Sequence, residues 1–386
     1  MDKSGLAAVW NVLPEARIVG GVVRDQIAGL PVSDVDLASP LPPATVIARL
    51  EAAGLRAIPT GIAHGTVTAL AGDQSFEITT LRRDIETDGR RAVVAFIDDW
   101  QADAARRDFT INAMSMDRAG TIFDYFGGQA DLAAGVVRFV GKPAIRIAED
   151  YLRILRFFRF FARYARGEPD APAIAAIAAS RAGLSQLSAE RVWQELKKIL
   201  AAPNPRAALH LMCETGVMAV ILPEAQPLDT LDIMIARAAP VDPLLRFAAL
   251  MPDDPATADR LKLSDAERSR LTTLATAPLL PPDADAATCR RALADWETGA
   301  LVDRTWLATD ADRSGLRARL VAMPRPVFPL MGRDALALGA MPGRALGEAL
   351  AAARDWWLTR DCLPGKAESL GKLEALLHEK KSKTFL

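Results

Sequence analysis

The sequence predicts an α+β head, a small mixed sheet with helices, followed by an all-α neck, body and tail. Short β-rich runs alternate with turn residues and helical stretches before about residue 145. Beyond that point strand patterns nearly vanish, and apolar residues recur at helical spacing. At 386 residues the chain is long enough for two or three domains. We place the head at residues 1–145, the neck at 146–224, and the body and tail at 225–386.

The elements of the head follow from short apolar runs bounded by turn residues. The predicted strands lie in the segments 17–21, 33–38, 65–70, 76–81, 92–97, 121–126 and 136–140. A helical stretch at residues 42–54 separates the second of these strands from the third. The charged segment 82–105 is either a lid over a site or a strand pair joined by a solvated turn at "TDGR".

Composition narrows the class of protein. The net charge of -1 argues against non-specific coating of nucleic acid, although a local basic patch would still steer a polyanion. The three cysteines, Cys213, Cys289 and Cys362, lie far apart, which predicts neither a disulfide framework nor a zinc site and fits a reducing cytoplasm. No apolar run reaches the length of a membrane span, so we expect no membrane association.

The stretch "SDVDLAS" carries two carboxylates on one face of a predicted strand. Asp34 and Asp36 are two residues apart and therefore point the same way, while Val35 and Leu37 point into a core. Two like charges so placed repel each other unless a cation lies between them, and oxygen ligands of this kind suit Mg²⁺. Glu77, on another predicted strand, is either a third carboxylate near the metal or a solvated side chain.

A glycine turn precedes this pair. Gly20 and Gly21 follow an apolar strand and open a helical segment, a place where backbone N–H groups can bind phosphate. Arg24, in the first turn of that helix, can add a charge-assisted contact to phosphate. The segment fits neither the Walker pattern nor G-x-G-x-x-G.

Residues 149–163 are predicted to form one helix with a cationic face. Arg153, Arg156, Arg159 and Arg163 fall within an arc of about 120°, with Glu149 and Asp150 in or beside it. This face suits a triphosphate or an RNA backbone; the alternative is an amphipathic helix whose charges pair with one another. A second neck helix is predicted at residues 188–202.

Five motifs resemble, in order, those of class II CCA-adding tRNA nucleotidyltransferases and bacterial poly(A) polymerases. They are "GGVVRD" followed by "SDVD", "RRDFTINAM" (106–114), "FDYFGGQADL" (123–132), "EDYLRILRFFRF" (149–160) and "SAERVWQEL" (188–196). The resemblance covers about residues 17–224, and the C-terminal half matches loosely. It implies a nucleotidyltransferase head, a neck that recognises the nucleotide base, and a body and tail that bind RNA.

The resemblance also implies roles for individual residues. Asp34 and Asp36 would bind two Mg²⁺ ions, and a primer 3′-OH would attack the α-phosphate of a nucleoside triphosphate. Arg107 would contact the nucleotide, while Asp150 and Arg153 would read its base. A carboxylate accepts from the amino groups of C and A, and faces a carbonyl oxygen in U and G. The segment 82–105 would be a mobile element needed for the final A. Asn112 could reach the sugar or be structural.

We therefore expect template-independent addition of C, C and A to tRNA 3′ ends from CTP and ATP, by a monomer or a homodimer. The nearest alternatives are a poly(A) polymerase and a partial enzyme that adds only CC or only A. A non-catalytic RNA-binding protein on the same scaffold is disfavoured by the intact Asp34, Asp36, Arg24 and Arg107. A signalling or antibiotic-modifying nucleotidyltransferase would not need the arginine-rich neck and the large helical C-terminal half.

Overall fold

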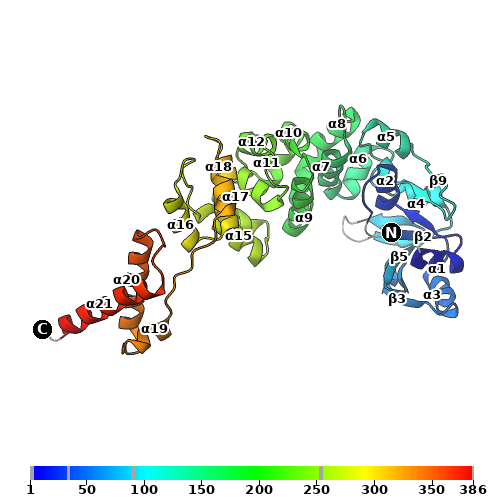
Figure 1. Cartoon of the computed structure of the whole chain (residues 1–386). Coiled ribbons are helices and arrows are strands. Elements are labelled where there is room, and N and C mark those ends of the chain that lie inside the picture. Colours follow the sequence, from blue (N-terminus) through cyan, green and yellow to red (C-terminus); the bar gives the residue numbers. More distant parts are fainter. Residues whose placement is uncertain (1–3, 33–34, 88–91, 252–254, 385–386) are drawn as a thin grey trace. The chain divides into compact units, whose positions relative to one another are not determined.

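The computed structural model describes residues 4–32, 35–87, 92–251 and 255–384 (Figure 1). It separates into two compact units, residues 1–225 with 260–262 and residues 226–259 with 263–386. In the described residues, all strands belong to the first unit, and the second unit is helical. The predicted fold class, a mixed sheet with helices followed by helices alone, is therefore confirmed.

The main sheet of the head has seven strands in the order β3-β4-β5-β2-β1-β8-β9. The strands β2 and β5 run parallel and the other neighbours are antiparallel, so the sheet is mixed. Its strands are β1 (Arg17–Val19), β2 (Asp36–Ser39), β3 (Arg56–Gly61), β4 (Thr66–Ala71), β5 (Gln74–Thr80), β8 (Ser115–Met116) and β9 (Ile122–Phe123).

Alternation along the strands divides the sheet into a buried and an open face. In β4 and β5 the residues Val67, Ala69, Phe76 and Ile78 are buried, and those between them are not. The helix α1 (Ser4–Val12) packs on the buried face, where a Cβ added to Gly5 would touch the Phe76 ring. The opposite face of the sheet is left for polar side chains.

The segment 82–105 is a strand pair followed by a helix, the plainer of the two predicted alternatives. The strands β6 (Arg82–Thr87) and β7 (Ala92–Phe96) pair antiparallel in a sheet of their own, and α4 (Trp100–Ala105) follows. The turn residues 88–91 lie outside the described residues. The Asp99 side chain caps α4 by accepting from the N–H groups of Gln101 and Ala102.

The predicted strand at residues 136–140 is wrong. Instead of a strand, this segment contains an isolated antiparallel β-bridge between Phe139 and Phe109. The Phe139 ring lies 4.7 Å from that of Phe109 and 6.0 Å from that of Phe157, so the apolar residues of this segment pack against a neck helix. The strands β3, which contains Pro59, and the two-residue β8 were not predicted, because neither has a strong apolar alternation.

The predicted neck helix is broken at Asp150. The helix α6 (Pro143–Glu149) ends there, Asp150 is extended (φ -158°, ψ 110°), and α7 (Leu152–Tyr164) begins anew. The Asp150 side chain accepts from the Leu152 N–H at 3.0 Å, a local turn that competes with the helix. The Tyr151 ring packs so closely on Gly183 that a Cβ at that glycine would clash with it.

The remaining helices of the first unit are α2 (Gly21–Ile27), α3 (Pro43–Ala52), α5 (Gly128–Ala134), α8 (Ala171–Ser180), α9 (Ala189–Leu200), α10 (Arg206–Glu214), α11 (Val217–Ile221) and the 3₁₀ turns η1 (Ile62–His64), η2 (Thr110–Asn112) and η3 (Arg181–Gln186). Of these, α2, α3 and α9 correspond to the helical segments predicted after the glycine turn, at residues 42–54 and at residues 188–202.

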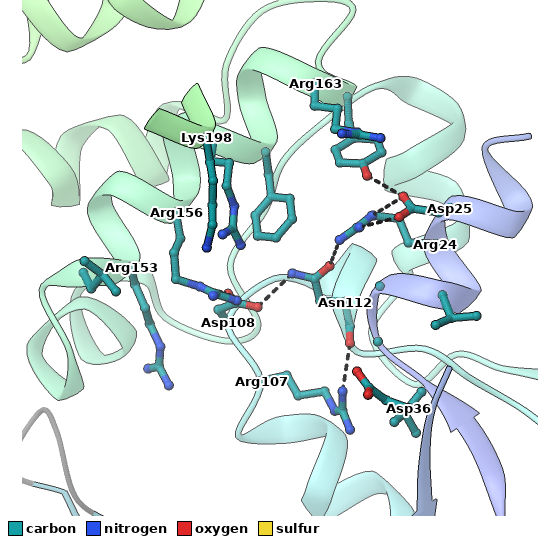
Figure 2. Close-up of a pocket in the computed structure, with 18 of the residues that line it drawn as sticks. Arg24, Asp25, Asp36, Arg107, Asp108, Asn112, Arg153, Arg156, Arg163 and Lys198 are labelled. Atoms are coloured by element: carbon teal, nitrogen blue, oxygen red, sulfur yellow. Dashed lines mark hydrogen bonds and ion pairs between the residues drawn. The ribbon is translucent and has the colours of Figure 1, made fainter. Parts of the chain in front are cut away.

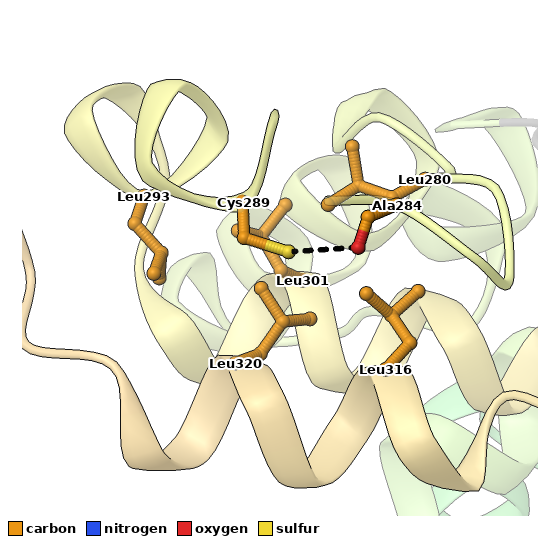
Figure 3. Close-up of a cluster of buried hydrophobic side chains, with 7 residues drawn as sticks. All are labelled: Leu280, Ala284, Cys289, Leu293, Leu301, Leu316 and Leu320. Atoms are coloured by element: carbon orange, nitrogen blue, oxygen red, sulfur yellow. Dashed lines mark hydrogen bonds between the residues drawn. The ribbon is translucent and has the colours of Figure 1, made fainter. Parts of the chain in front are cut away.

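The helices after residue 225 pack in small clusters. They are α12 (Asp229–Ala236), α13 (Pro243–Leu250), α14 (Pro255–Arg260), α15 (Asp265–Thr276), α16 (Ala286–Asp295), α17 (Thr298–Leu307), α18 (Ser314–Ala322), α19 (Gly332–Ala337), α20 (Arg344–Thr359) and α21 (Lys366–Thr384). Figure 3 shows one core, in which Leu293, Leu301, Leu316 and Leu320 surround Cys289. Burial raises the pKa of the Cys289 thiol, so this cysteine serves as a small apolar core residue. No helix in the described part of the chain is long and apolar enough to cross a membrane.

Candidate active site

One cavity of about 1030 Å³ in the first unit collects most of the predicted site residues. Its walls come from the β1–α2 turn, the start of β2, the segment 106–112, and the neck helices α7 and α9. The predicted residues that line it are Gly20, Gly21, Arg24, Asp36, Arg107, Asp150, Arg153, Arg156 and Arg159. Glu77 is not among the lining residues, and Asp34 lies outside the described residues.

Asp36 stands on the open face of the sheet, as its position in the sequence predicts. Its side chain is exposed, whereas Val35 and Leu37 on either side are buried. Asp36 pairs in register with Glu77 of the parallel strand β5, so the two carboxylates are neighbours on one face. The described residues contain no group of three side chains that could hold a metal. The exposed oxygen donors of Asp36 and Glu77 nevertheless fit a hard divalent cation.

The glycine turn brings the backbone close to an arginine. Gly20 has φ 69°, which an L side chain rarely adopts, and a Cβ there would lie 3.1 Å from an Nη1 atom of Arg107. The N–H of Gly20 donates to the Met114 carbonyl at 3.2 Å, so this N–H group is already occupied. Gly21 is the first residue of α2, whose leading N–H groups have no partner within the helix.

Asp103 holds the arginine pair of the "RRDF" segment in place. This buried carboxylate accepts from Arg106 Nε at 2.8 Å, Arg107 Nη2 at 3.2 Å and the Arg82 N–H at 3.2 Å. Burial by itself would raise the pKa of Asp103, but the two guanidiniums and the Arg82 N–H outweigh it, and the pKa is lowered. Sequence reasoning missed Asp103, although its spacing of three and four residues from the two arginines on a helix was the available signal.

Arg24 belongs to a buried hydrogen-bond chain between head and neck (Figure 2). Its guanidinium donates to both carboxylate oxygens of Asp25 at 3.0 Å and to the Asn112 side-chain oxygen. It also lies over the rings of Phe160 and Tyr164, at 5.0 and 4.6 Å from their centroids. Arg24 lines the cavity, so its contact with phosphate stays a prediction, and these hydrogen bonds use three of its five N–H donors.

Tyr164 closes one end of this chain. Its hydroxyl donates to Asp25 across 139 residues of sequence. Burial first, and then the hydrogen bond to the Asp25 carboxylate, raise the pKa of Tyr164 to about 12. The neutral phenol is therefore the form that the fold favours.

Asp108 closes the other end of this chain. It is a buried carboxylate ahead of the 3₁₀ turn η2, which follows Phe109. It accepts from Asn112 Nδ2 at 3.0 Å, from the Phe109 N–H at 2.9 Å and from Arg156 Nε at 2.6 Å. Burial would raise the pKa of Asp108, but Arg156 and these hydrogen bonds lower it. Asn112, bonded to both Arg24 and Asp108, is thereby a structural link in the chain.

Three of the four arginines of α7 are paired with carboxylates. Arg153 pairs with Glu149, Arg156 with Asp108, and Arg159 Nη1 with Glu195 at 2.9 Å. The predicted alternative of paired charges thus holds for these three, although all three partners lie outside α7. Arg163 is exposed and has no ion-pair partner among the described residues.

Asp150 and Arg153, the predicted base-reading pair, both line the cavity, but their side chains pair with other residues. Asp150 Oδ2 accepts from Arg191 Nη2 at 2.7 Å. Arg153 Nη1 donates to the Arg146 carbonyl at 2.7 Å as well as to Glu149. The break in the neck helix separates the two side chains, which the prediction of one continuous helix did not anticipate.

Glu195 of α9 completes the polar wall of the neck. This buried carboxylate accepts through Oε1 from Arg159 at 2.9 Å and from Lys198 at 3.3 Å. The sequence alone predicts no role for Glu195, although the residue lies within the last of the five motifs. Its position on the apolar face of an amphipathic helix was the available indication that this carboxylate is buried and paired.

Two family models match the chain. "Poly A polymerase head domain" matches residues 16–138, and "Probable RNA and SrmB-binding site of polymerase A" matches residues 170–228. The first match contains the Asp-x-Asp strand and the "RRDF" segment. The second contains α9 and the neck segment that follows it.

Known proteins resemble the chain over most of its length. The mitochondrial CCA tRNA nucleotidyltransferase 1 of Mus musculus is 37% identical over 374 residues, 89% of this chain and 82% of the relative. The CCA-adding enzyme of Geobacillus thermodenitrificans is 38% identical over 205 residues, 53% of this chain and 50% of the relative. The crystal structure of the Bacillus stearothermophilus CCA-adding enzyme in complex with CTP has a TM-score of 0.79 at 26% identity, covering 99% of this chain and 98% of that one.

Proposed function

The chain belongs to the CCA tRNA nucleotidyltransferase family, and on that premise we propose that it adds C, C and A to tRNA 3′ ends from CTP and ATP without a template. The observation that carries the proposal is the cavity itself. Its lining includes Asp36 at the start of β2, Asp150 and Arg153 of the neck, and several further arginines. Such a site can hold a triphosphate and examine a base at the same time.

We propose Mg²⁺ as the metal of this site, in a family of nucleotidyltransferases that uses a divalent metal. Asp34 and Asp36 would hold it, with Glu77 as a third carboxylate on the neighbouring strand. When bound, Mg²⁺ would lower the pKa of the primer 3′-OH and neutralise the leaving pyrophosphate. The chain's own part is to present these carboxylates on the open face of the sheet.

The head arginines would orient the triphosphate. Arg107 is held by Asp103 and lies against the Gly20 turn, so its guanidinium is fixed before a nucleotide enters. A donor placed in advance loses little entropy on binding phosphate. The N–H groups at the start of α2, from Gly21 on, would add neutral donors to the same phosphates.

Asp150 and Arg153 would select the base. The Asp150 carboxylate can accept from the amino group of C or A, and Arg153 can donate to a ring acceptor. U and G would place a carbonyl oxygen against the carboxylate, and two acceptors in contact cost a few kcal/mol where water is excluded. Arg191 holds Asp150 in its orientation through the 2.7 Å ion pair.

Asp150→Ala should reduce discrimination against UTP and GTP. The variant removes both the acceptor for C and A and the clash with U and G, at a loss of roughly 2–4 kcal/mol in transition-state stabilisation for CTP and ATP. We would measure kcat/KM for all four nucleotides on tRNA one step short of completion. Glu168→Ala is the control, since it removes an exposed neck carboxylate that does not line the cavity and should keep the base ratios. Unchanged ratios in Asp150→Ala would place base choice elsewhere.

The domains would divide the work as the sequence predicts. The head, residues 1–145, would carry the chemistry, and the neck, residues 146–224, would recognise the base. The body and tail, residues 225–386, would bind the tRNA, in a monomer or a homodimer. We place the enzyme in a reducing compartment, the cytoplasm, because Cys213, Cys289 and Cys362 are all free thiols.

The product distinguishes this function from its alternatives. The head model's name includes poly(A) polymerase, which would add many A residues to RNA. The test is incubation of the purified chain with Mg²⁺, tRNA lacking its CCA end, and CTP or ATP alone or together. We expect extension to stop at C, C, A when both nucleotides are present. A long A ladder on unstructured RNA would contradict CCA addition, and a stop after CC or addition of A alone would indicate a partial enzyme.

A further inference from the structure

A second hollow, of about 460 Å³, begins where the neck arginine Arg163 stands at the edge of the main cavity. Arg163 lines both hollows. We call the second one the Arg163 groove; its lining residues are Phe161, Ala162, Arg163, Ala165, Arg166, Gly167, Pro203, Asn204 and Ala207. Two arginines and no carboxylate line the groove, in contrast to the main cavity, whose lining includes four aspartates among its arginines.

The two groove arginines keep their charge for a ligand. Arg163 is exposed, and its nearest charge–ring contact is the Tyr164 ring at 5.9 Å. Arg166 donates to the Leu132 carbonyl at 3.0 Å, which orients the guanidinium without neutralising it. Asn204 accepts the Arg206 N–H at 3.2 Å, which leaves its amide NH₂ as a donor. Two guanidiniums with an amide donor beside them suit the oxygens of a phosphodiester backbone.

The position of the groove argues for RNA. Figure 2 shows Arg163 and Asp36 at opposite ends of the cavity, with the hydrogen-bond chain through Arg24 between them. The triphosphate proposed above belongs at the Asp36 end, so Arg163 is left for the other substrate. One wall of the groove, Pro203 to Ala207, lies within residues 170–228, which match a model described as an RNA-binding site.

We propose that the Arg163 groove binds backbone phosphates of the tRNA 3′ strand close to the primer end. The inference rests on the proposed function, because it names where that function's RNA substrate lies. Each arginine would contact one phosphate, and each contact would release bound counterions from the RNA. Binding through the groove would depend on salt and not on the base sequence.

The test is steady-state addition of A to tRNA ending in CC, with Arg163→Ala at several salt concentrations. We expect the KM for tRNA to rise about 5- to 10-fold, the KM for ATP to stay within about twofold, and Arg163→Lys to recover part of the loss. The slope of log kcat/KM for tRNA against log salt should become shallower by about 0.7–0.9. Arg118→Ala, an exposed arginine in a head turn, is the control with equal loss of charge and should leave the slope unchanged.

Asn204→Asp is a second, independent test of the groove proposal. It keeps the oxygen that accepts the Arg206 N–H and places a negative charge in the groove, so the KM for tRNA should rise again. Unchanged KM and salt slope in Arg163→Ala and Asn204→Asp would overturn the groove proposal. A rise in the KM for ATP in place of tRNA would overturn it too, in favour of a nucleotide site. The product made by the unmodified chain tells the two failures apart. If it still ends in C, C, A, the proposed function holds and only the groove proposal is wrong.

Discussion

Asp36→Asn should abolish the addition of both C and A while leaving tRNA binding largely intact. The amide keeps the size of the side chain but removes the negative charge that a divalent cation requires. Loss of several kcal/mol of charge stabilisation corresponds to a decrease in kcat of about 10³-fold or more. Single-turnover extension of tRNA with saturating CTP or ATP measures this directly, and a filter-binding assay reports the tRNA affinity.

Asp73→Asn is the control for this prediction. Asp73 is an exposed carboxylate in the turn between β4 and β5 of the same sheet, and its loss should leave turnover unchanged. Glu77→Gln asks whether the neighbouring strand contributes a ligand: a strong loss would support a third carboxylate at the metal. If Asp36→Asn turns over like the unmodified chain in Mg²⁺, the metal assignment is wrong.

Asp108→Asn should lower the stability of the first unit and its activity together. The buried carboxylate is the ion-pair partner of Arg156, and removing one partner of such a pair leaves the other charge uncompensated. The Arg156 side chain is 33% exposed, so we expect the lower end of the usual range, about 3 kcal/mol, or a Tm lower by roughly 6–12 °C. Thermal unfolding followed by circular dichroism measures it.

The effect of Asp108→Asn should depend on pH in one direction. Because the pKa of Asp108 is lowered in the fold, its carboxylate contributes stability that is present above the unfolded value, near pH 4. That contribution is lost as the pH falls through the lower folded value. The difference in unfolding free energy between the two proteins should therefore be constant from about pH 5 to 8 and shrink below about pH 4. The control is Glu168→Gln, a change at an exposed neck residue, which should leave the unfolding free energy unchanged at every pH. A loss of stability in Asp108→Asn that grows as the pH falls would contradict the ion pair.

Local patterns in the sequence determined much of this site. The two-residue alternation placed Asp36 on the open face between the buried Val35 and Leu37, and the order of the five motifs identified the family. The apolar spacing of α7 likewise predicted that its arginines lie opposite buried residues such as Leu155 and Phe158. Such patterns can be read without a structure because each depends on neighbours a few residues apart in one strand or helix.

Only the tertiary structure decided which partner each charge has. Asp108 meets Arg156 across 48 residues, and Asp25 meets Tyr164 across 139. The pairing of β2 with β5 likewise puts Glu77 beside Asp36. At the break in the neck helix Tyr151 packs against Gly183, and in the segment 136–140 Phe139 packs against Phe157, in both cases a contact between distant segments. A repeat of apolar residues encodes which face is buried, but buried charges are satisfied by groups that the fold brings together from distant segments.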